Sequence, residues 1–425
     1  MELTRRYFLK TSGALVAYSG LSSLDSLAER LAVADKRAVA RGKTPVVIFL
    51  LGGMDGLNFI TPFKEREYYR LRKALALPPP GAENGLLDLD GFFGLNPQAA
   101  ALHPLFQSGQ AVALHAVGYA NNTRSHFEEQ DVWETGVIGN TVNSDGWLNR
   151  HLLTSEGRGP LRAVSVGDSL PRILRGEAPA YALRGITDLQ FPGKSAQERN
   201  AMAAALEHAY CTSPDQHHGA AMDMLERTAS TTFDGIRQIR EISEQPYQPR
   251  AEYPEHALAR KLREVARLIK SDVGLEVAEV DYGGWDTHNK QGGLDGGYGK
   301  LVRGLGDSLA AFTRDLGDRM NDVLVLTLSD FGRTAAENGN QGTDHGWANC
   351  MLALGGPVRA ATGGKPRRVL TDWPGLAPEQ LHQKRDLKHT TDFRDVLGEV
   401  VAKHLGNDNI RKILGSHEFR PVGLI

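Results

Sequence analysis

The strongest constraint on the fold is a series of short, uninterrupted apolar runs that end at glycine, serine or aspartate. The clearest runs cover residues 46–51, 111–117 and 323–328. A continuous apolar run is typical of a parallel strand that is covered on both faces. Segments with helical apolar spacing lie at residues 258–269 and 301–316. Strands alternating with helices of this length predict an α/β fold, with a mostly parallel central sheet and helices on both faces.

The first 40 residues have the features of an export signal. Residues 4–10 read Thr-Arg-Arg-Tyr-Phe-Leu-Lys, an apolar stretch covers residues 11–24, and small-x-small cleavage candidates lie at 32–34 and 38–40. A short amphipathic helix would explain the apolar stretch but not the paired arginines. The segment predicts the twin-arginine export machinery as a partner and a periplasmic or secreted location. The apolar stretch is too short for a permanent membrane span, and no later run is long or apolar enough.

The remaining residues, 41–425, are enough for one large α/β domain or two smaller ones, and we expect a single domain. The formal net charge of -2 provides no basic field to attract nucleic acid, so nucleic acid is not an expected partner. Two cysteines, Cys211 and Cys350, permit at most one disulfide and exclude a disulfide scaffold. Neither belongs to a Cys-x-x-Cys pair, so thiolate zinc coordination is not expected.

Candidate metal ligands follow the predicted strands. They are Asp55, Asp286, His288, Asp330, Asp344 and His345. The carboxyl ends of parallel strands meet at one edge of a sheet, so we expect these side chains to converge there. Oxygen and imidazole ligands together suit Zn, Mn or a related divalent ion. The alternative is that these residues only form polar turns, in which aspartate and glycine are common.

Two divalent ions about 4 Å apart can hold the attacking and leaving oxygens of an in-line displacement at phosphorus or sulfur. Ser125 is the candidate nucleophile, because a metal-bound hydroxyl is deprotonated more easily. Arg124 or Arg333 is a candidate for binding the equatorial oxygens as a bidentate fork. His126 is either a base or ligand, or a hydrogen-bonded structural histidine.

Five short motifs, taken together and in order, resemble one family. They are Gly-Gly-Met-Asp-Gly at 52–56, Arg-Ser-His-Phe at 124–127, Gly-Gly-Trp-Asp-Thr-His at 283–288, Ser-Asp-Phe-Gly-Arg-Thr at 329–334 and Gly-Thr-Asp-His-Gly at 342–346. This set resembles the domain of unknown function 1501 family, which is similar to the alkaline phosphatase and sulfatase superfamily. The resemblance implies an alkaline phosphatase-like fold over residues 41–425 and one or two divalent ions, of Zn, Mn, Ca or Mg.

The resemblance also implies roles for single residues. Asp55 matches an early carboxylate ligand, Ser125 lies where the superfamily has its nucleophile, and Asp286 with His288 resembles one metal site. Asp330 resembles the aspartate of a later Asp-His pair, and His345 supplies a final imidazole. We therefore expect Asp55 and Asp330 to lie close enough to share an ion.

Two departures affect this assignment. Phe331 follows Asp330 where the superfamily usually has histidine, and the spacing of Asp286 and His288 is shorter than usual. An alternative alignment makes Asp344 and His345 the Asp-His pair itself, and His389 is a further candidate imidazole.

The predicted function is an exported, metal-dependent hydrolase of phosphate or sulfate esters, acting on a small-molecule or polysaccharide substrate. Cys211 does not fit the Cys/Ser-x-Pro-x-Arg frame of a formylglycine sulfatase. The main alternative is a catalytically silent relative that binds an envelope polysaccharide or a partner protein. A mutase or transferase that moves a phosphoryl group between sugars is a third possibility.

Overall fold

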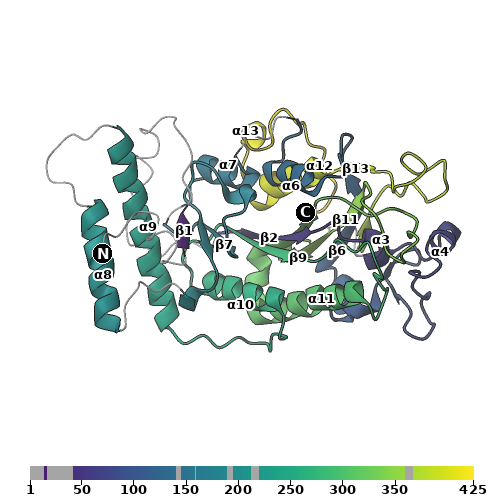
Figure 1. The fold of residues 1–425 in the computed structure, drawn as a ribbon, viewed down its shortest axis with the longest axis horizontal. Coiled ribbons are helices and arrows are strands. Elements are labelled where there is room, and N and C mark those ends of the chain that lie inside the picture. Colours follow the sequence, from purple (N-terminus) through teal and green to yellow (C-terminus); the bar gives the residue numbers. More distant parts are fainter. Residues whose placement is uncertain are drawn as a thin grey trace.

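The central element is a ten-stranded sheet in the order β1-β8-β7-β9-β2-β10-β11-β6-β12, with β13 also paired to β6 (Figure 1). It is seen in a computed structural model that describes residues 14–16, 42–139, 145–157, 159–188, 195–211, 220–358 and 367–425. The strands are β1 (Ala14–Val16), β2 (Thr44–Leu51), β6 (Ala111–Gly118), β7 (Ala163–Val166), β8 (Tyr181–Leu183), β9 (Val277–Gly283), β10 (Val323–Ser329), β11 (Asn349–Gly355), β12 (Val369–Leu370) and β13 (Thr391–Asp392).

Most strand pairs of this sheet are parallel. The pairs β8/β7, β7/β9, β9/β2 and β2/β10 are parallel, and so are β12/β6 and β13/β6. Strand β11 runs antiparallel to both β10 and β6, and β1 runs antiparallel to β8. This mixed, mostly parallel sheet confirms the predicted α/β class and is consistent with an alkaline phosphatase-like architecture.

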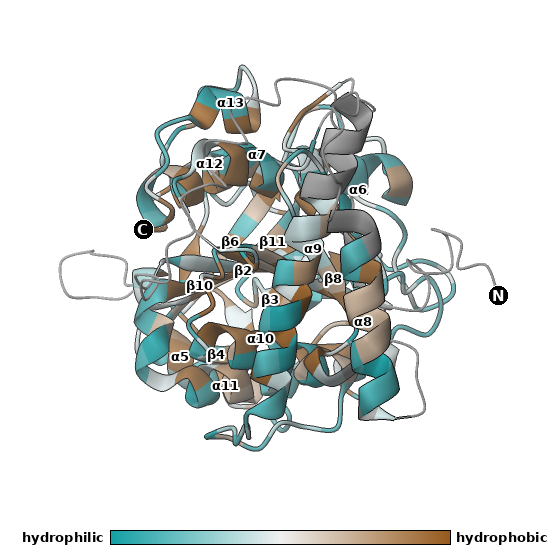
Figure 2. Cartoon of the chain, turned by 90° about the vertical axis from the view of Figure 1, so that its left-hand side faces the viewer, coloured by the Kyte–Doolittle hydropathy of each residue, from teal (hydrophilic) through white to brown (hydrophobic). Residues whose placement is uncertain are grey.

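Helices cover both faces of the sheet (Figure 1). One face carries α10 (Ala257–Lys270) and α11 (Gly297–Leu316). The other carries α6 (His126–Thr135), α7 (Trp147–Thr154), α12 (Phe393–Glu399) and α13 (Ile410–Leu414), and α12 continues as a π-helix over Val400–His404. Figure 2 shows that these helices are hydrophilic along part of their surface and hydrophobic along the rest.

Strand β2 shows why an apolar run without alternation was needed. Val46 and Ile48 belong to the core cluster shared with α10 and α11, whereas Val47 and Phe49 belong to the cluster shared with α12. All four side chains are fully buried. Because successive strand residues point to opposite faces, a strand between two helix layers must be apolar at every position.

The remaining elements include a small second sheet, several short helices and one pair of long helices. Residues 64–98 contain α4 (Arg66–Leu71) and most of a small antiparallel sheet of β3 (Ile60–Thr61), β5 (Gly94–Leu95) and β4 (Leu87–Asp88). Helices α3 (Gly56–Phe59) and α5 (His103–Gln107) are short. Helices α8 (Ala196–Cys211) and α9 (Ala220–Glu244) stand side by side beyond the β1 end of the sheet (Figures 1 and 2).

The segment predicted to be an export signal, residues 1–40, lies outside the described residues except for residues 14–16, which form β1. Among the helices of the described residues, none combines the length and apolar character needed to cross a membrane.

Candidate metal centre

Three loops meet at the carboxyl edge of the sheet: the loops after β6 and β9, and the loop that joins β10 to β11. The loop after β9 carries Asp286 and His288, and the loop after β10 begins with Asp330. His345 lies just before β11, whose first residues are at the same edge because β11 is antiparallel to β10. The loop after β6 leads to His126, the first residue of α6. The sheet topology therefore brings together segments that are far apart in the sequence.

His126, Asp286 and His345 form a group that could hold a metal ion. Their facing atoms are close: Nε2 of His126 lies 3.0 Å from Nε2 of His345, and Nε2 of His345 lies 3.2 Å from Oδ1 of Asp286. The third separation, from Nε2 of His126 to Oδ1 of Asp286, is 3.5 Å. His288 joins them, with its Nε2 at 2.9 Å from Oδ1 of Asp286 and 3.1 Å from Nε2 of His345.

The opposite nitrogen of each of these rings faces an oxygen acceptor. Nδ1 of His345 lies 2.9 Å from the carbonyl oxygen of Arg124, and a carbonyl can only accept. Nδ1 of His126 contacts Oδ2 of Asp330. Each of these two rings therefore donates Nδ1–H, which in the neutral form leaves a lone pair on Nε2.

His288 follows the same rule. Its Nδ1 lies 2.8 Å from Oδ1 of Asp344, which also accepts a hydrogen bond from the side chain of Asn338. The hydrogen bonds of His288 and Asn338 outweigh the effect of burial and lower the pKa of Asp344, so this carboxylate is ionised and accepts. A hydrogen bond from the far nitrogen to a carboxylate or carbonyl is the usual arrangement around metal-bound histidine.

Asp330 is held by the backbone of the β2 loop. Its Oδ1 accepts hydrogen bonds from the amides of Gly52 at 3.1 Å and Gly53 at 3.0 Å. Both glycines have positive φ, of 115° and 68°. A Cβ on Gly52 would lie 2.5 Å from the amide nitrogen of Asp286, so only glycine fits this close approach.

A divalent ion fits this donor set. Neutral Nε2 atoms cannot hydrogen-bond to one another or to a carboxylate oxygen, so their lone pairs face each other at contact distance unless protons or a cation lie between them. The separations of 3.0–3.5 Å also match the ~3.3 Å edge of a tetrahedron with ligand bonds of about 2.0–2.1 Å. The side chains of His126 and Asp286 are 27% and 44% exposed, so solvent or substrate can reach them.

Arg333 fixes Asp286 from the protein side. Its buried guanidinium lies 2.7 Å from Oδ1 of Asp286, and its Nε donates to Oγ1 of Thr343. Burial opposes ionisation of Asp286, but the contact with Arg333 outweighs burial and lowers the pKa of this carboxyl. The structure thus places Arg333, expected to bind substrate, against a candidate ligand and other protein groups.

The two imidazoles of the triad have opposite electrostatic surroundings. The hydrogen bond to Asp330 raises the pKa of His126, whereas burial lowers that of His345. Phe331, which stands where the superfamily usually has histidine, packs against both rings at centroid distances of 4.6 and 4.8 Å. This departure therefore provides an apolar wall beside the imidazoles.

Ser125 and Arg124 precede His126 directly. Ser125 is the N-cap residue of α6, yet its side chain does not cap the helix. The guanidinium of Arg124 is bound to Asp386, with NH2 at 2.6 Å from Oδ2. The side chain of Arg124 is therefore engaged within the protein, while its carbonyl oxygen faces His345.

Asp55 is bound outside this group. Its Oδ2 lies 2.5 Å from the guanidinium of Arg72 and 2.6 Å from the side-chain amide of Gln291. Asp55 and Arg72 are both buried, so the charge of Asp55 is neutralised within the interior. The carboxylates of Asp55 and Asp330, expected to share an ion, thus have separate partners.

Sequence reasoning left the role of His126 open between ligand and structural residue, and the structure puts it in the triad. It missed Asp386, which belongs to none of the five motifs. His389, the further candidate imidazole, instead accepts a hydrogen bond from Trp347 through Nδ1 at 3.1 Å.

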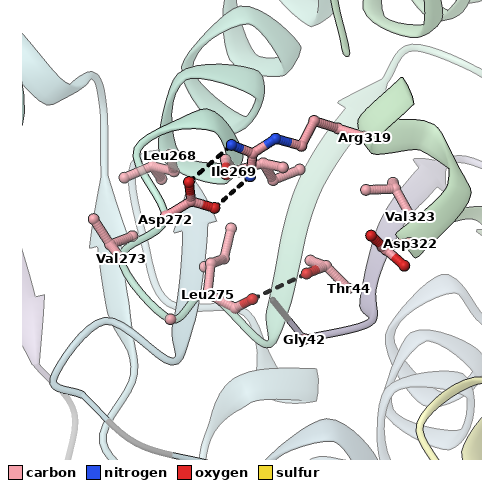
Figure 3. Close-up of a pocket in the computed structure, with 11 residues that line it drawn as sticks. Gly42, Thr44, Leu268, Ile269, Asp272, Val273, Leu275, Arg319, Asp322 and Val323 are labelled. Carbon is pink, nitrogen blue, oxygen red and sulfur yellow. Dashed lines mark hydrogen bonds and ion pairs between the residues drawn. The ribbon is translucent and has the colours of Figure 1, made fainter. Parts of the chain in front are cut away.

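Two cavities lie at the opposite, amino edge of the strands. The one drawn in Figure 3 has a volume of about 40 Å³ and is bordered by Thr44 and Val323, the first residues of β2 and β10. Its Arg319 and Asp272 pair with each other. A larger cavity of about 690 Å³ is lined by residues of α10 and the segment before it, including Tyr247 and Lys270. None of the candidate ligands lines either cavity.

Comparison with known proteins identifies the family. The family described as "Protein of unknown function (DUF1501)" matches residues 104–414, so the chain belongs to it. No curated protein matches. One similar solved structure is the C-terminal periplasmic domain of EcEptC from Escherichia coli in complex with Zn, with 9% sequence identity and a TM-score of 0.34 over 76% of this chain and 75% of that chain.

Proposed function

We propose that this DUF1501 protein is an exported, metal-dependent hydrolase of phosphate or sulfate esters. The observation that supports the proposal is the orientation of three imidazoles. His126, His288 and His345 each donate Nδ1–H to an oxygen and turn Nε2 toward Oδ1 of Asp286. Such convergence of lone pairs and a carboxylate is explained by a divalent cation, for which Zn and Mn have the right ligand preference.

One ion, held by His126, Asp286 and His345 with His288 beside them, fits the donor set better than two. Asp330 and Asp344 are engaged by His126 and His288, and Asp55 is paired with Arg72. A three-residue ligand set that solvent can reach is typical of catalytic rather than structural zinc. When bound, the ion would supply positive charge to polarise an ester oxygen and stabilise the negative charge of the transition state.

The residues of the chain have separate tasks in this scheme. Asp330, Asp344 and the Arg124 carbonyl orient the imidazoles, and Arg333 holds Asp286. Phe331 packs against the rings of His126 and His345 and excludes water from that side of them.

Ser125 is the proposed nucleophile. It neighbours His126 at the start of α6, and its hydroxyl is not used as a helix cap. Its Oγ would attack phosphorus or sulfur in line with the leaving oxygen, which departs as an alcohol with the serine proton. Water would then cleave the serine ester to release phosphate or sulfate and restore the hydroxyl.

The test is a screen of the mature protein against aryl phosphates, phosphodiesters and aryl sulfates with Zn, Mn, Mg and Ca. We expect turnover with at least one ester class, its loss on chelation, and its loss in Ser125→Ala with metal content unchanged. Metal binding without turnover on any ester would favour the silent relative that binds a polysaccharide or a partner protein. Full turnover in Ser125→Ala would remove the serine from the mechanism.

A transferase is distinguished from a hydrolase by its acceptor. Transfer of the phosphoryl group to a hydroxyl of an added sugar, rather than to water, would favour a transferase that acts between sugars. Mass spectrometry of the protein with substrate would detect the serine ester in either case.

A further inference from the structure

Asp386 lies outside every motif, yet it is fully buried and carries a negative charge close to the candidate centre. Its Oδ2 accepts from Nε of Arg124 at 3.1 Å and from NH2 of the same guanidinium at 2.6 Å. Arg385 adds a longer contact of 3.3 Å to the same oxygen. A buried carboxylate with this many contacts fixes the arginine that it binds.

Arg124 transmits this constraint to two imidazoles. Its backbone has a φ of 60°, the left-handed region that arginine rarely adopts. Its amide donates to the side chain of Asn122 at 2.7 Å, and its carbonyl oxygen accepts from Nδ1 of His345 at 2.9 Å. Because His126 follows two residues later, the conformation at Arg124 contributes to the placement of both imidazoles.

The segment around Asp386 also holds the loop of His345 directly. NH2 of Arg385 donates to the backbone carbonyl of His345 at 3.0 Å. The amide of Ala348 donates to the carbonyl of Leu387 at 3.2 Å. Residues 385–387 therefore contact the loop of His345 at two points and, through Asp386, the loop of His126.

We propose that Asp386, acting through Arg124, is a positioning residue for the metal centre. It touches neither the proposed ion nor substrate. It holds the Arg124 carbonyl so that Nε2 of His345 faces Nε2 of His126 and Oδ1 of Asp286. The inference rests on the proposed metal-dependent function and adds a determinant of its ligand geometry.

The experiment compares Asp386→Asn and Arg124→Met with the wild-type protein. Asparagine keeps the shape of the carboxylate but removes its charge. Methionine keeps part of the aliphatic stem of Arg124 but removes the guanidinium, which lies over the ring of Trp347. The control is Glu399→Gln, which also changes a fully buried carboxylate, paired with Lys403 at 2.7 Å and bound to the backbone of the C-terminal segment. The measurements are the Kd for Zn²⁺, the visible spectrum of the Co²⁺ form and the thermal midpoint of the metal-free protein.

We expect both variants to weaken Zn²⁺ binding by about 10- to 100-fold, as is usual when a residue that orients a ligand is lost. The Co²⁺ bands should shift or lose intensity in both variants, because band position and strength report ligand geometry. Glu399→Gln should leave the affinity and the spectrum unchanged, even if it lowers the thermal midpoint as much as Asp386→Asn does.

The outcomes separate this inference from the proposed function. If the wild-type protein binds Zn²⁺ and both variants keep its Kd and its Co²⁺ spectrum, the positioning role is wrong and the proposed function stands. If Glu399→Gln changes them as much as Asp386→Asn does, the effect is general destabilisation and the positioning role is again wrong. If the wild-type protein binds no divalent ion, the proposed function fails and this inference fails with it.

Discussion

Two aspartates at the same edge of the sheet differ in their burial and in their charged partners. Asp286 follows β9 and Asp55 follows β2, and these strands are neighbours. Asp286 is partly exposed and faces three imidazoles as well as Arg333. Asp55 is buried and paired with Arg72. A carboxylate at a strand end is therefore a candidate ligand only if its charge is not already neutralised by a buried partner.

The histidines of the candidate metal centre and His115 near Asp55 also differ in whether all their ring nitrogens are already hydrogen-bonded. In the candidate centre, Nε2 of each histidine points toward another candidate metal-ligand atom. Near Asp55, the buried His115 has both nitrogens engaged: Nε2 lies 3.0 Å from the carbonyl of Ile60, and Nδ1 accepts from the amide of Ala116 at 2.9 Å. That ring is satisfied as a neutral group, so it offers no lone pair to a metal.

The largest effect should come from breaking the ion pair of the buried region. Arg72→Ala leaves the Asp55 carboxylate buried without its cation, and we expect a loss of about 3–5 kcal/mol in the free energy of unfolding. Urea denaturation measures it, with Arg70→Ala as the control, since Arg70 forms an exposed pair with Glu67. The metal content of folded Arg72→Ala should stay at the wild-type level. Its loss would mean that the Asp55 region belongs to the metal centre after all.

Removing one imidazole should act on metal binding instead. His345→Ala deletes the ring whose Nε2 lies within 3.2 Å of all three other candidate ligand atoms. We expect the Zn²⁺ affinity to fall by about 3–4 kcal/mol, since protein zinc sites bind with about 10–16 kcal/mol in total. Competition with a chromophoric chelator measures the change. His417→Ala is the matched control, because His417 pairs with Asp395. Equal retention of Zn²⁺ in both variants would contradict the assignment.

Lowering the pH should reduce the free energy of unfolding, because protonation of the buried His115 is unfavourable in the folded protein. Burial lowers the pKa of His115 from 6.5 to about 4. Between these values the unfolded chain binds a proton that the folded protein does not, so this contribution to stability is present above pH 6.5 and is lost as the pH falls to 4. The expected loss is about 3 kcal/mol at pH 4.

The pH dependence can be checked by chemical denaturation from pH 7 to pH 4. His115→Gln should have a shallower fall in the free energy of unfolding over that range, whatever its stability at pH 7. An identical slope in both proteins would show that His115 is protonated as readily in the folded state as in the unfolded chain.

The smallest effect should follow from loosening one imidazole of the centre. Asp344→Asn keeps the size of the side chain but weakens its hydrogen bond to Nδ1 of His288, so Zn²⁺ affinity should drop about 10-fold and by no more than 100-fold. Isothermal titration calorimetry measures the change. A drop as large as that of His345→Ala would make Asp344 a direct ligand, as the sequence alone allowed.

The strands were predictable because their composition follows from burial on both faces, as at residues 46–51. The meeting of Asp286, His288 and His345 at one sheet edge was predictable from topology, since parallel strands place their following loops together. The pairing of Asp55 was not predictable, because Arg72 belongs to none of the five motifs and reaches Asp55 only in the folded protein. The pairing of Asp386 with Arg124 was not predictable either, because 262 positions separate the two residues in the sequence.

The direct test of the account is the metal stoichiometry of the folded wild-type protein, measured by inductively coupled plasma mass spectrometry after loading with Zn²⁺ and gel filtration. One ion per chain is predicted, together with less than one in His345→Ala and one in Asp55→Asn. Two ions in the wild-type protein, with one lost in Asp55→Asn, would restore the shared site of Asp55 and Asp330. No bound ion in the wild-type protein would contradict the metal centre itself.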